Sequence, residues 1–160
     1  MVAMGFCWHG KSRLYVVPEK TKVSSEVFIK SIPKPMITED IPRSFRDKKH
    51  KVIFRMDSAP SHRAAITQEY FKQQRLQYIP AKEWMPYSPD MAQMDYAING
   101  NLKTNLKCRV ARDRGQLVRA VRYEWSKIKI LTIRRVLKSW RARVETMVKR
   151  FGDHVEDVLS

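Results

Sequence analysis

The order of apolar runs between residues 51 and 80 constrains the fold of this chain most. KVIFRM at 51–56 and LQYIP at 76–80 are short runs with the composition of buried strands. The residues between them predict a helix from His62 to about Gln74, with Ser61 as its N-cap. A strand–helix–strand order joins neighbouring parallel strands, so we expect a parallel βαβ unit.

The preceding residues predict a hairpin followed by a broken helical stretch. VAMGFCWHG and SRLYVVP are β-branched and aromatic runs, and the tripeptide HGK at 9–11 predicts the turn between them. A short helix is expected near Ser25–Ile32. Three prolines are then expected to break any long helix (Pro33, Pro35, Pro42).

The last 70 or so residues predict three helices. The first begins near Asp90 and runs to about Leu106, and the third ends at Gly152 as its C-cap. The second and third carry apolar stripes that we interpret as core (Leu117, Val121, Trp125, Ile128; Ile133, Val136, Leu137, Trp140, Val144, Met147, Val148, Phe151). The sequence therefore predicts one α/β domain over residues 1–160, with a helical C-terminal half.

Charge favours a polyanionic partner. The chain has 32 Lys and Arg against 16 Asp and Glu, a net charge of +16. The first 100 residues carry 16 basic and 10 acidic side chains, whereas the last 60 carry 16 and 6. No run of 18 apolar residues predicts a membrane span, and Cys7 and Cys108 form no metal-binding or disulfide pattern. DNA is the expected partner and a membrane is not.

Two acidic segments are the candidates for chemistry. In FRMDSAPSH at 54–62, Asp57 follows a predicted buried strand, where α/β sheets bind ligands. In YSPDMAQMDY at 87–96, Asp90 is interpreted as a helix cap and Asp95, five residues on, as the better candidate ligand. Taken singly, Asp57 could also be a turn cap and Asp95 a solvated side chain.

Together the two segments resemble the DDE/DDD endonuclease domain of mariner-type transposases. In that family one acid lies in a strand-end motif similar to D-N-A-P-x-H, matched here by DSAPSH at 57–62. Another lies in a motif similar to S-P-D-L-x-P-x-[DE], matched here by SPDMAQMD at 88–95. The resemblance implies an RNase H-like fold with a mixed sheet, and it extends from the hairpin to the closing RFGDHVED.

The resemblance implies metal-dependent cleavage and strand transfer of DNA with two Mg²⁺ ions. Asp57 and Asp95 would be catalytic and hold the metals, with His62 and Asp90 in supporting positions. For His62 itself, a packing or hydrogen-bonding role in the first turn of the helix is the favoured reading. Basic residues of the helices are the expected DNA contacts, although solvated surface side chains are the alternative reading (Lys103, Lys107, Arg134, Arg135, Arg141, Arg143). A nuclear location and a homodimer are further expectations from the family.

The sequence also departs from the family. The family's first catalytic Asp lies on the opening strand of the fold, upstream of the hairpin that begins here at Val2. We therefore expect the fold to lack its first strand, Mg²⁺ to bind weakly, and the chain to be inactive. Two alternatives remain: an active enzyme of which this is one part, or a non-enzymatic basic DNA-binding protein. Membrane-surface binding by a basic amphipathic helix is a fourth reading, disfavoured because the core needs the apolar stripe.

Overall fold

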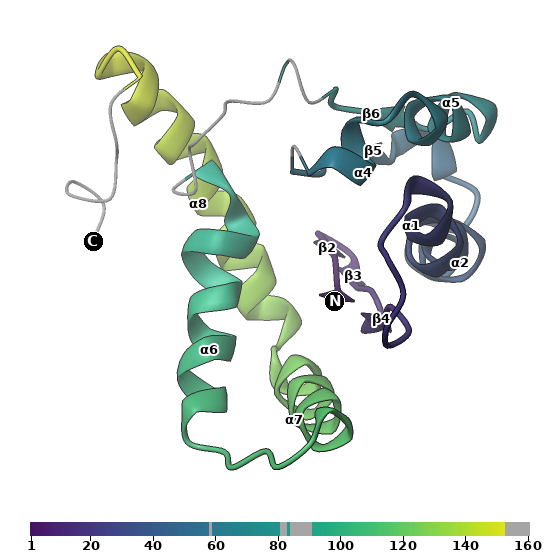
Figure 1. Cartoon of the computed structure of the whole chain (residues 1–160). Coiled ribbons are helices and arrows are strands. Elements are labelled where there is room, and N and C mark those ends of the chain that lie inside the picture. The colour runs from purple at the N-terminus through teal and green to yellow at the C-terminus, as the bar shows by residue number, and fades with distance from the viewer. Residues whose placement is uncertain (58, 81–82, 84–90, 153–160) are drawn as a thin grey trace. The chain divides into compact units, whose positions relative to one another are not determined.

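A computed structural model of the chain describes residues 1–57, 59–80, 83 and 91–152 (Figure 1). The chain divides into two compact units, Met1–Pro86 and Tyr87–Ser160, called unit 1 and unit 2 below. Asp57 belongs to unit 1 and Asp95 to unit 2.

Unit 1 opens with the predicted hairpin. Strand β1 (Val2–Ala3) pairs with β4 (Tyr15–Val16), and β2 (Phe6–Cys7) pairs with β3 (Gly10–Lys11), both antiparallel. The turn differs from the prediction, because Gly10 and Lys11 are paired strand residues and the two residues before them form the turn.

The short helix expected near Ser25–Ile32 is confirmed as α1 (Ser25–Ser31), which ends at Ile32 (φ −127°, ψ −73°), just before Pro33. The expectation that the later prolines break the helical path is wrong, because α2 (Pro33–Pro35), the π-helical segment η1 (Met36–Asp40) and α3 (Ile41–Phe45) follow one another without a gap. Pro33 and Pro42 lie in the first turns of α2 and α3. At that position a backbone N–H has no acceptor within its own helix, so a proline there costs no helical hydrogen bond. The π segment carries the run onward between α2 and α3, with the Ile41 N–H donating to the Met36 carbonyl.

The expected parallel βαβ unit is confirmed. After the short 3-10 turn η2 (Lys49–Lys51), strand β5 (Ile53–Phe54) pairs in parallel with β6 (Gln77–Tyr78). The connection contains α4 (Pro60–Arg63) and α5 (Ala65–Gln73). The predicted cap Ser61 is wrong: Ala59 is the N-cap, and proline fits the first helical position after it.

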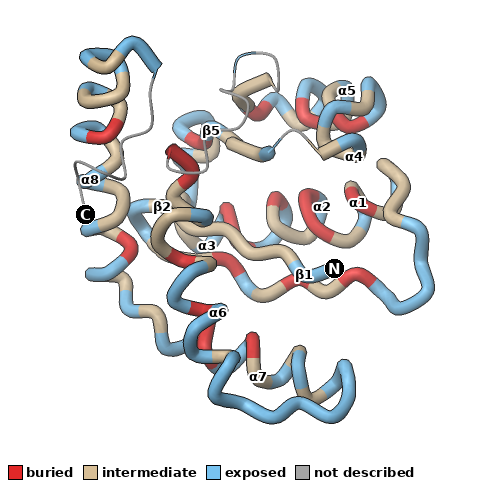
Figure 2. Tube along the Cα trace, turned by 60° about the vertical axis from the view of Figure 1, so that its left-hand side comes forward, coloured by how far each residue is buried: buried red, intermediate tan, exposed pale blue. Residues whose placement is uncertain are grey.

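Two apolar clusters form the core of unit 1. One gathers buried side chains from η1, α3, α5 and the flanks of the parallel strands (Ile37, Ile41, Val52, Phe71, Leu76). The other joins the hairpin to α1 (Tyr15, Val17, Phe28, Ile32). Buried positions of α1 and α5 are red in Figure 2. The second cluster brings α1 next to the start of α4, where the candidate site lies.

A buried carboxylate also links the hairpin to the helical run. Asp40 is 4% exposed and accepts from the backbone N–H of Arg13 at 3.1 Å and from Arg43 Nη2 at 2.8 Å. The Tyr15 hydroxyl donates to the same carboxylate, and burial together with this bond raises the pKa of Tyr15. These contacts satisfy a buried charge that would otherwise be costly, so Asp40 is a structural acid of unit 1.

Unit 2 is helical, as predicted. The π-helical segment η4 (Met94–Asn99) continues into α6 (Gly100–Lys107), followed by α7 (Arg114–Lys127) and α8 (Ile130–Lys149). The cap residue of α8 is Arg150 rather than Gly152, which lies two residues later with φ +99° and donates its N–H to the Met147 carbonyl at 3.0 Å. The predicted start of the first helix at Asp90 lies outside the described residues.

The apolar stripes of α7 and α8 supply only part of the predicted core. Val121, Trp125 and Ile133 are buried, whereas Leu117, Val148 and Phe151 are exposed. Among the described residues, no helix is both long enough and apolar enough to cross a membrane.

Candidate metal and nucleic-acid site

Asp57 lies just beyond β5, at the carboxyl end of the parallel pair. Its side chain is 76% exposed. Ligands of α/β folds bind at the carboxyl ends of parallel strands because the chain turns there into loops and helix N-termini. The position predicted from the sequence is therefore one from which a carboxylate can meet a ligand.

The carboxylate of Asp57 is held by two local contacts. The backbone N–H of Ala59 donates to Oδ1 at 2.9 Å, and Nδ1 of His62 lies 2.7 Å from the same oxygen. Nδ1 of His62 also lies 3.3 Å from the carbonyl oxygen of Asp57. The hydrogen bond from His62 lowers the pKa of Asp57 most, and the hydrogen bond from Ala59 lowers it further. Together they outweigh the effect of partial burial and hold the pKa of Asp57 below its usual range. The group is thus kept as a carboxylate.

His62 is itself fixed by the core. Its side chain is only 17% exposed, and its ring lies 4.3 Å from that of Phe28 between centroids, at a tilt of 39°. Phe28 is 3% exposed within the cluster that joins the hairpin to α1. The packing and hydrogen-bonding role considered for His62 therefore has a structural basis. The contact with Phe28 was not foreseen, since no local sequence signal pairs residues so far apart.

Asp95 has a different setting. It lies in the first turn of η4, is exposed, and accepts at Oδ1 from Asn99 Nδ2 at 3.0 Å. The next residue anchors this segment to α8, because the Tyr96 hydroxyl donates to the Val136 carbonyl at 3.1 Å. Asp90, the predicted supporting acid, lies outside the described residues.

Each predicted metal ligand, taken within its own unit, is of the kind that a hard divalent cation prefers. Asp57 and Asp95 both present exposed carboxylates, and oxygen ligands are those that Mg²⁺ prefers. Within residues 1–57, 59–80, 83 and 91–152, no group of three or more acidic, His or Cys side chains gathers to hold a metal. Metal ligation by the two acids remains a prediction.

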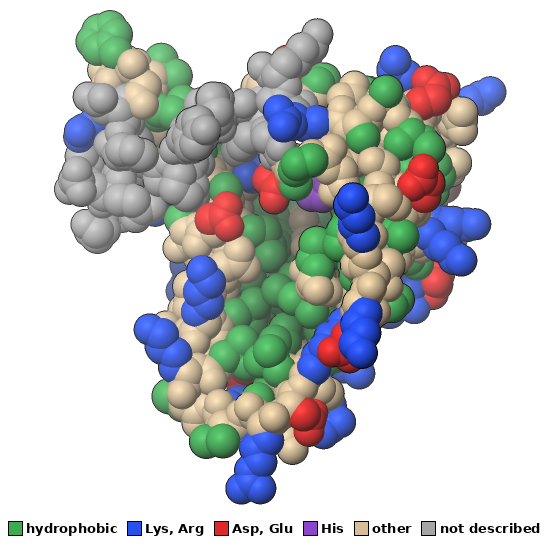
Figure 3. All heavy atoms as spheres, in the orientation of Figure 1, with side chains coloured by type: hydrophobic (Ala, Val, Ile, Leu, Met, Phe, Trp, Pro, Cys, Tyr) green, Lys and Arg blue, Asp and Glu red, His purple; other side chains and the backbone are tan. Residues whose placement is uncertain are grey.

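The predicted DNA-contacting residues are not equally accessible. Lys103 and Lys107 are exposed on α6, and Arg135 and Arg141 are exposed on α8. Figure 3 shows Lys and Arg side chains over α6 and over the turn that leads to α7. These side chains can meet phosphates without rearrangement of the fold.

Arg143 and Arg134 are placed less openly. The guanidinium carbon of Arg143 lies 3.9 Å from the ring centroid of Tyr96, and the residue is 9% exposed. Arg134 is half-buried. Arg141, although exposed, donates from Nε to Glu145 at 2.9 Å. The arginines of α8 thus divide into packing and surface positions, a division that charge counting along the sequence missed.

A further polar cluster of unit 2 was not foreseen. Glu124, with a side chain 5% exposed, accepts from Arg109 Nε at 3.0 Å and from Asn105 Nδ2 at 3.2 Å. Arg109 and Lys127 both lie over the Tyr123 ring, at 4.7 and 4.2 Å from its centroid. This cluster holds the end of α6 against α7. It also engages Arg109 and Lys127 in contacts within unit 2.

Comparison with solved structures establishes the fold. The crystal structure of the catalytic domain of Mos1 mariner transposase matches with a TM-score of 0.82 at 17% identity, over 97% of this chain and 75% of that one. The Mos1 catalytic domain with raltegravir and Mg matches at 0.81 and 18% identity, over 97% and 76%. A pre-cleavage Mos1 transpososome matches at 0.84 and 17% identity, over 97% of this chain and 45% of that one.

These likenesses show that the chain has the RNase H-like fold of the Mos1 catalytic domain, as the sequence resemblance predicted. No protein-family model matches the sequence, and no curated protein matches it.

Proposed function

We propose that this chain is a catalytic domain of the mariner transposase type, acting on DNA. One observation carries the proposal: an exposed carboxylate, Asp57, stands at the end of a parallel strand in a fold shared with the Mos1 catalytic domain. The acidic motifs around Asp57 and Asp95 support it independently of the fold. Mos1 structures include complexes with transposon DNA, which supports DNA as the substrate class.

Asp57 and Asp95 are the proposed metal ligands. Mos1 catalytic-domain structures contain Mg or Mn, and bound divalent cations would activate the attacking oxygen and stabilise the leaving one. The chain's own residues keep Asp57 ionised and fixed at Oδ1. A nuclear location and a homodimer are parts of the same proposal.

We further propose that the 160-residue polypeptide does not cleave DNA by itself. Only Asp57 and Asp95 match positions that the family's catalytic acids hold in these motifs, and two-metal phosphodiester cleavage depends on metal ions held in a fixed geometry. Supercoiled plasmid incubated with Mg²⁺ is expected to be nicked no faster by this polypeptide than by its Asp57→Asn variant. Mg²⁺-dependent nicking that Asp57→Asn abolishes would contradict this part of the proposal.

A second candidate function is metal-independent DNA binding. The exposed cations of unit 2 favour it, because phosphate contacts alone give salt-dependent and largely sequence-independent affinity. Replacing four of these cations together by alanine should weaken binding to duplex DNA (Lys103, Lys107, Arg135, Arg141). The slope of log K against log salt should flatten by about 0.9 for each phosphate contact removed.

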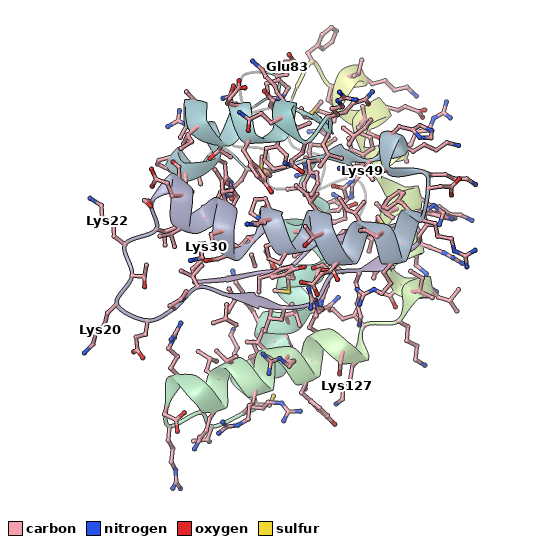
Figure 4. All side chains as sticks on the ribbon, turned by 90° about the vertical axis from the view of Figure 1, so that its right-hand side faces the viewer. Lys20, Lys22, Lys30, Lys49, Glu83 and Lys127 are labelled. Atoms are coloured by element: carbon pink, nitrogen blue, oxygen red, sulfur yellow. The ribbon has the colours of Figure 1, made fainter. Side chains whose placement is uncertain are left out.

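Unit 1 offers a matched control for the DNA measurement. In Figure 4, Lys20 and Lys22 project from the loop between β4 and α1, while Lys30 lies on α1 and Lys49 on η2. Replacing these four removes the same charge from unit 1, and the salt slope should change less. Equal flattening by both quadruple variants would show that total charge, rather than a unit 2 surface, drives binding. DNA binding that persists without Mg²⁺ and in the Asp57→Asn variant favours metal-independent binding. DNA binding that needs both Mg²⁺ and the Asp57 carboxylate favours the catalytic domain.

A further inference from the structure

We propose that His62 and Phe28 are positioning residues for Asp57, and that they fix Oδ1 so that Oδ2 is its metal-ligating oxygen. The inference deepens the proposed function and rests on it. Its starting observation is that, among the described residues, both polar contacts of this carboxylate fall on one oxygen. Ala59 N lies 2.9 Å and His62 Nδ1 2.7 Å from Oδ1.

These two contacts restrict an otherwise free side chain. Asp57 is 76% exposed, so apolar packing does little to hold its carboxylate. The Ala59 contact belongs to the turn that starts α4 and holds the oxygen from the backbone. The His62 contact reaches the same oxygen from the first turn of α4. Held from two directions, the carboxyl group presents its second oxygen in one orientation.

The restriction on Asp57 originates in the core of unit 1. The His62 side chain is 17% exposed, and its ring packs on that of Phe28, which is 3% exposed. Phe28 is in turn packed among the hairpin and α1 residues of its cluster. A chain of contacts thus runs from α1 through the imidazole to an exposed carboxylate.

Metal-ligating carboxylates in proteins are commonly hydrogen-bonded in this way. Groups that hydrogen-bond to a metal-ligating side chain fix its orientation, and the loss of such a group commonly reduces metal affinity by about 10–100-fold. Nδ1 of His62 is the ring nitrogen that faces Oδ1, and a carboxylate oxygen only accepts, so the hydrogen of this contact lies on Nδ1.

The variants separate the effect of the ring contact between His62 and Phe28 from the effect of the hydrogen bond between His62 and Asp57. His62→Phe keeps a ring against Phe28 but removes Nδ1, whereas His62→Asn keeps a nitrogen at the same distance along the side chain but removes the ring. Phe28→Leu removes the ring contact from the other side. The probe is Mn²⁺ alone at pH 8, with binding followed by paramagnetic broadening of backbone amide signals at Asp57, Ala59 and His62. Thermal unfolding of each variant checks that the fold is kept.

The expected result is a Kd for Mn²⁺ about 10-fold higher in His62→Phe, a smaller increase in Phe28→Leu, and partial recovery in His62→Asn. The metal-free protein should show the Nδ1–H tautomer of His62 in ¹⁵N NMR. An unchanged Kd in folded His62→Phe, or the Nε2–H tautomer, would overturn the positioning role.

Asp57→Asn distinguishes this inference from the function on which it rests. If Asp57→Asn abolishes the local broadening while His62→Phe leaves it intact, Asp57 is a ligand and His62 does not position it. If Asp57→Asn leaves the broadening unchanged, the metal role of Asp57 fails, and the positioning role fails with it.

Discussion

The two units hold their exposed candidate acids differently, although each unit also has a buried acid that links its elements, Asp40 in unit 1 and Glu124 in unit 2. In unit 1, Ala59 and His62 hold one exposed carboxylate, and the histidine is backed by a buried ring. In unit 2, Glu124 of α7 accepts from Asn105 of α6 and from Arg109 just beyond α6, so its contacts hold the two helices together. Among the described residues, Asp95 accepts a side-chain hydrogen bond from Asn99 alone.

The difference indicates that the two units have different roles. Unit 1 fixes an acid in advance, which lowers the cost of ordering it when a ligand binds. Unit 2 builds a helical scaffold that presents cations, and many of its own acids are engaged in caps or ion pairs. Three substitutions test this difference, and they follow in order of decreasing expected effect.

Phe71→Ala should have the largest effect. Phe71 is fully buried, and its ring lies 5.1 Å from that of Phe54 and 5.7 Å from that of Tyr78, on the two parallel strands. Removing it should lower the free energy of unfolding of unit 1 by about 3–5 kcal/mol, measured by chemical denaturation. Ile66→Ala, at a 48% exposed position of the same helix, should cost less than about 0.5 kcal/mol.

Hydrogen exchange localises the Phe71→Ala effect. The Ile79 amide, which donates to the Phe54 carbonyl at 2.9 Å, should lose protection in Phe71→Ala. Amides of α7 and α8 should keep theirs. Equal loss of protection in both units would contradict a separate role for each.

Tyr96→Phe should have an intermediate effect, confined to unit 2. It removes the hydroxyl that donates to the Val136 carbonyl but keeps the ring beneath Arg143. The carbonyl still accepts from Ser139 Oγ at 2.9 Å, so the loss should fall near the lower end of about 0.5–1.5 kcal/mol. Denaturant unfolding measures it. A loss as large as that of Phe71→Ala would mean that the polar anchor of η4 matters as much as a core ring.

The smallest expected effect is a pH dependence from Glu124. Burial alone would raise its pKa, but hydrogen bonds from Arg109 and the nearby cations hold the pKa below its usual 4.5. The folded state therefore favours the carboxylate. Its contribution to stability should be complete above about pH 4.5 and lost as the pH falls through the lowered pKa. The effect is small because water screens Arg109 and Lys127, which are 39% and 54% exposed.

A matched variant isolates the Glu124 contribution. Glu124→Gln cannot ionise, so its free energy of unfolding should fall less between pH 7 and pH 3 than that of the parent chain. Equal losses in the two proteins would assign the acid sensitivity to other carboxylates.

Local sequence patterns predicted the hairpin, the parallel βαβ unit and the helices of unit 2, because each depends on turn residues and on hydrophobic period. They also located Asp57 at a strand end. They failed at Pro42, which lies in the first turn of α3 and lets the helical path continue from η1. That position depends on where the preceding helix stops.

Long-range contacts account for the remaining differences. Arg143 has the sequence setting of a surface cation, yet Tyr96, from another segment of unit 2, covers it. His62 likewise meets Phe28 only because α1 and α4 pack together. Such pairings follow from tertiary packing, which no window of sequence contains, and they change how many charges are accessible and how firmly an acid is held.

The parallel pairing of β5 with β6 has a consequence for the order of folding. Unlike a hairpin, this pair joins Ile53 to Gln77 across the whole length of α4 and α5. The chain must close that loop before the strands can pair, and such non-local contacts are characteristic of late folding steps. Local helices and the N-terminal hairpin can form first. We therefore expect the acid at the end of β5 to take its final position only once this non-local strand pair has closed.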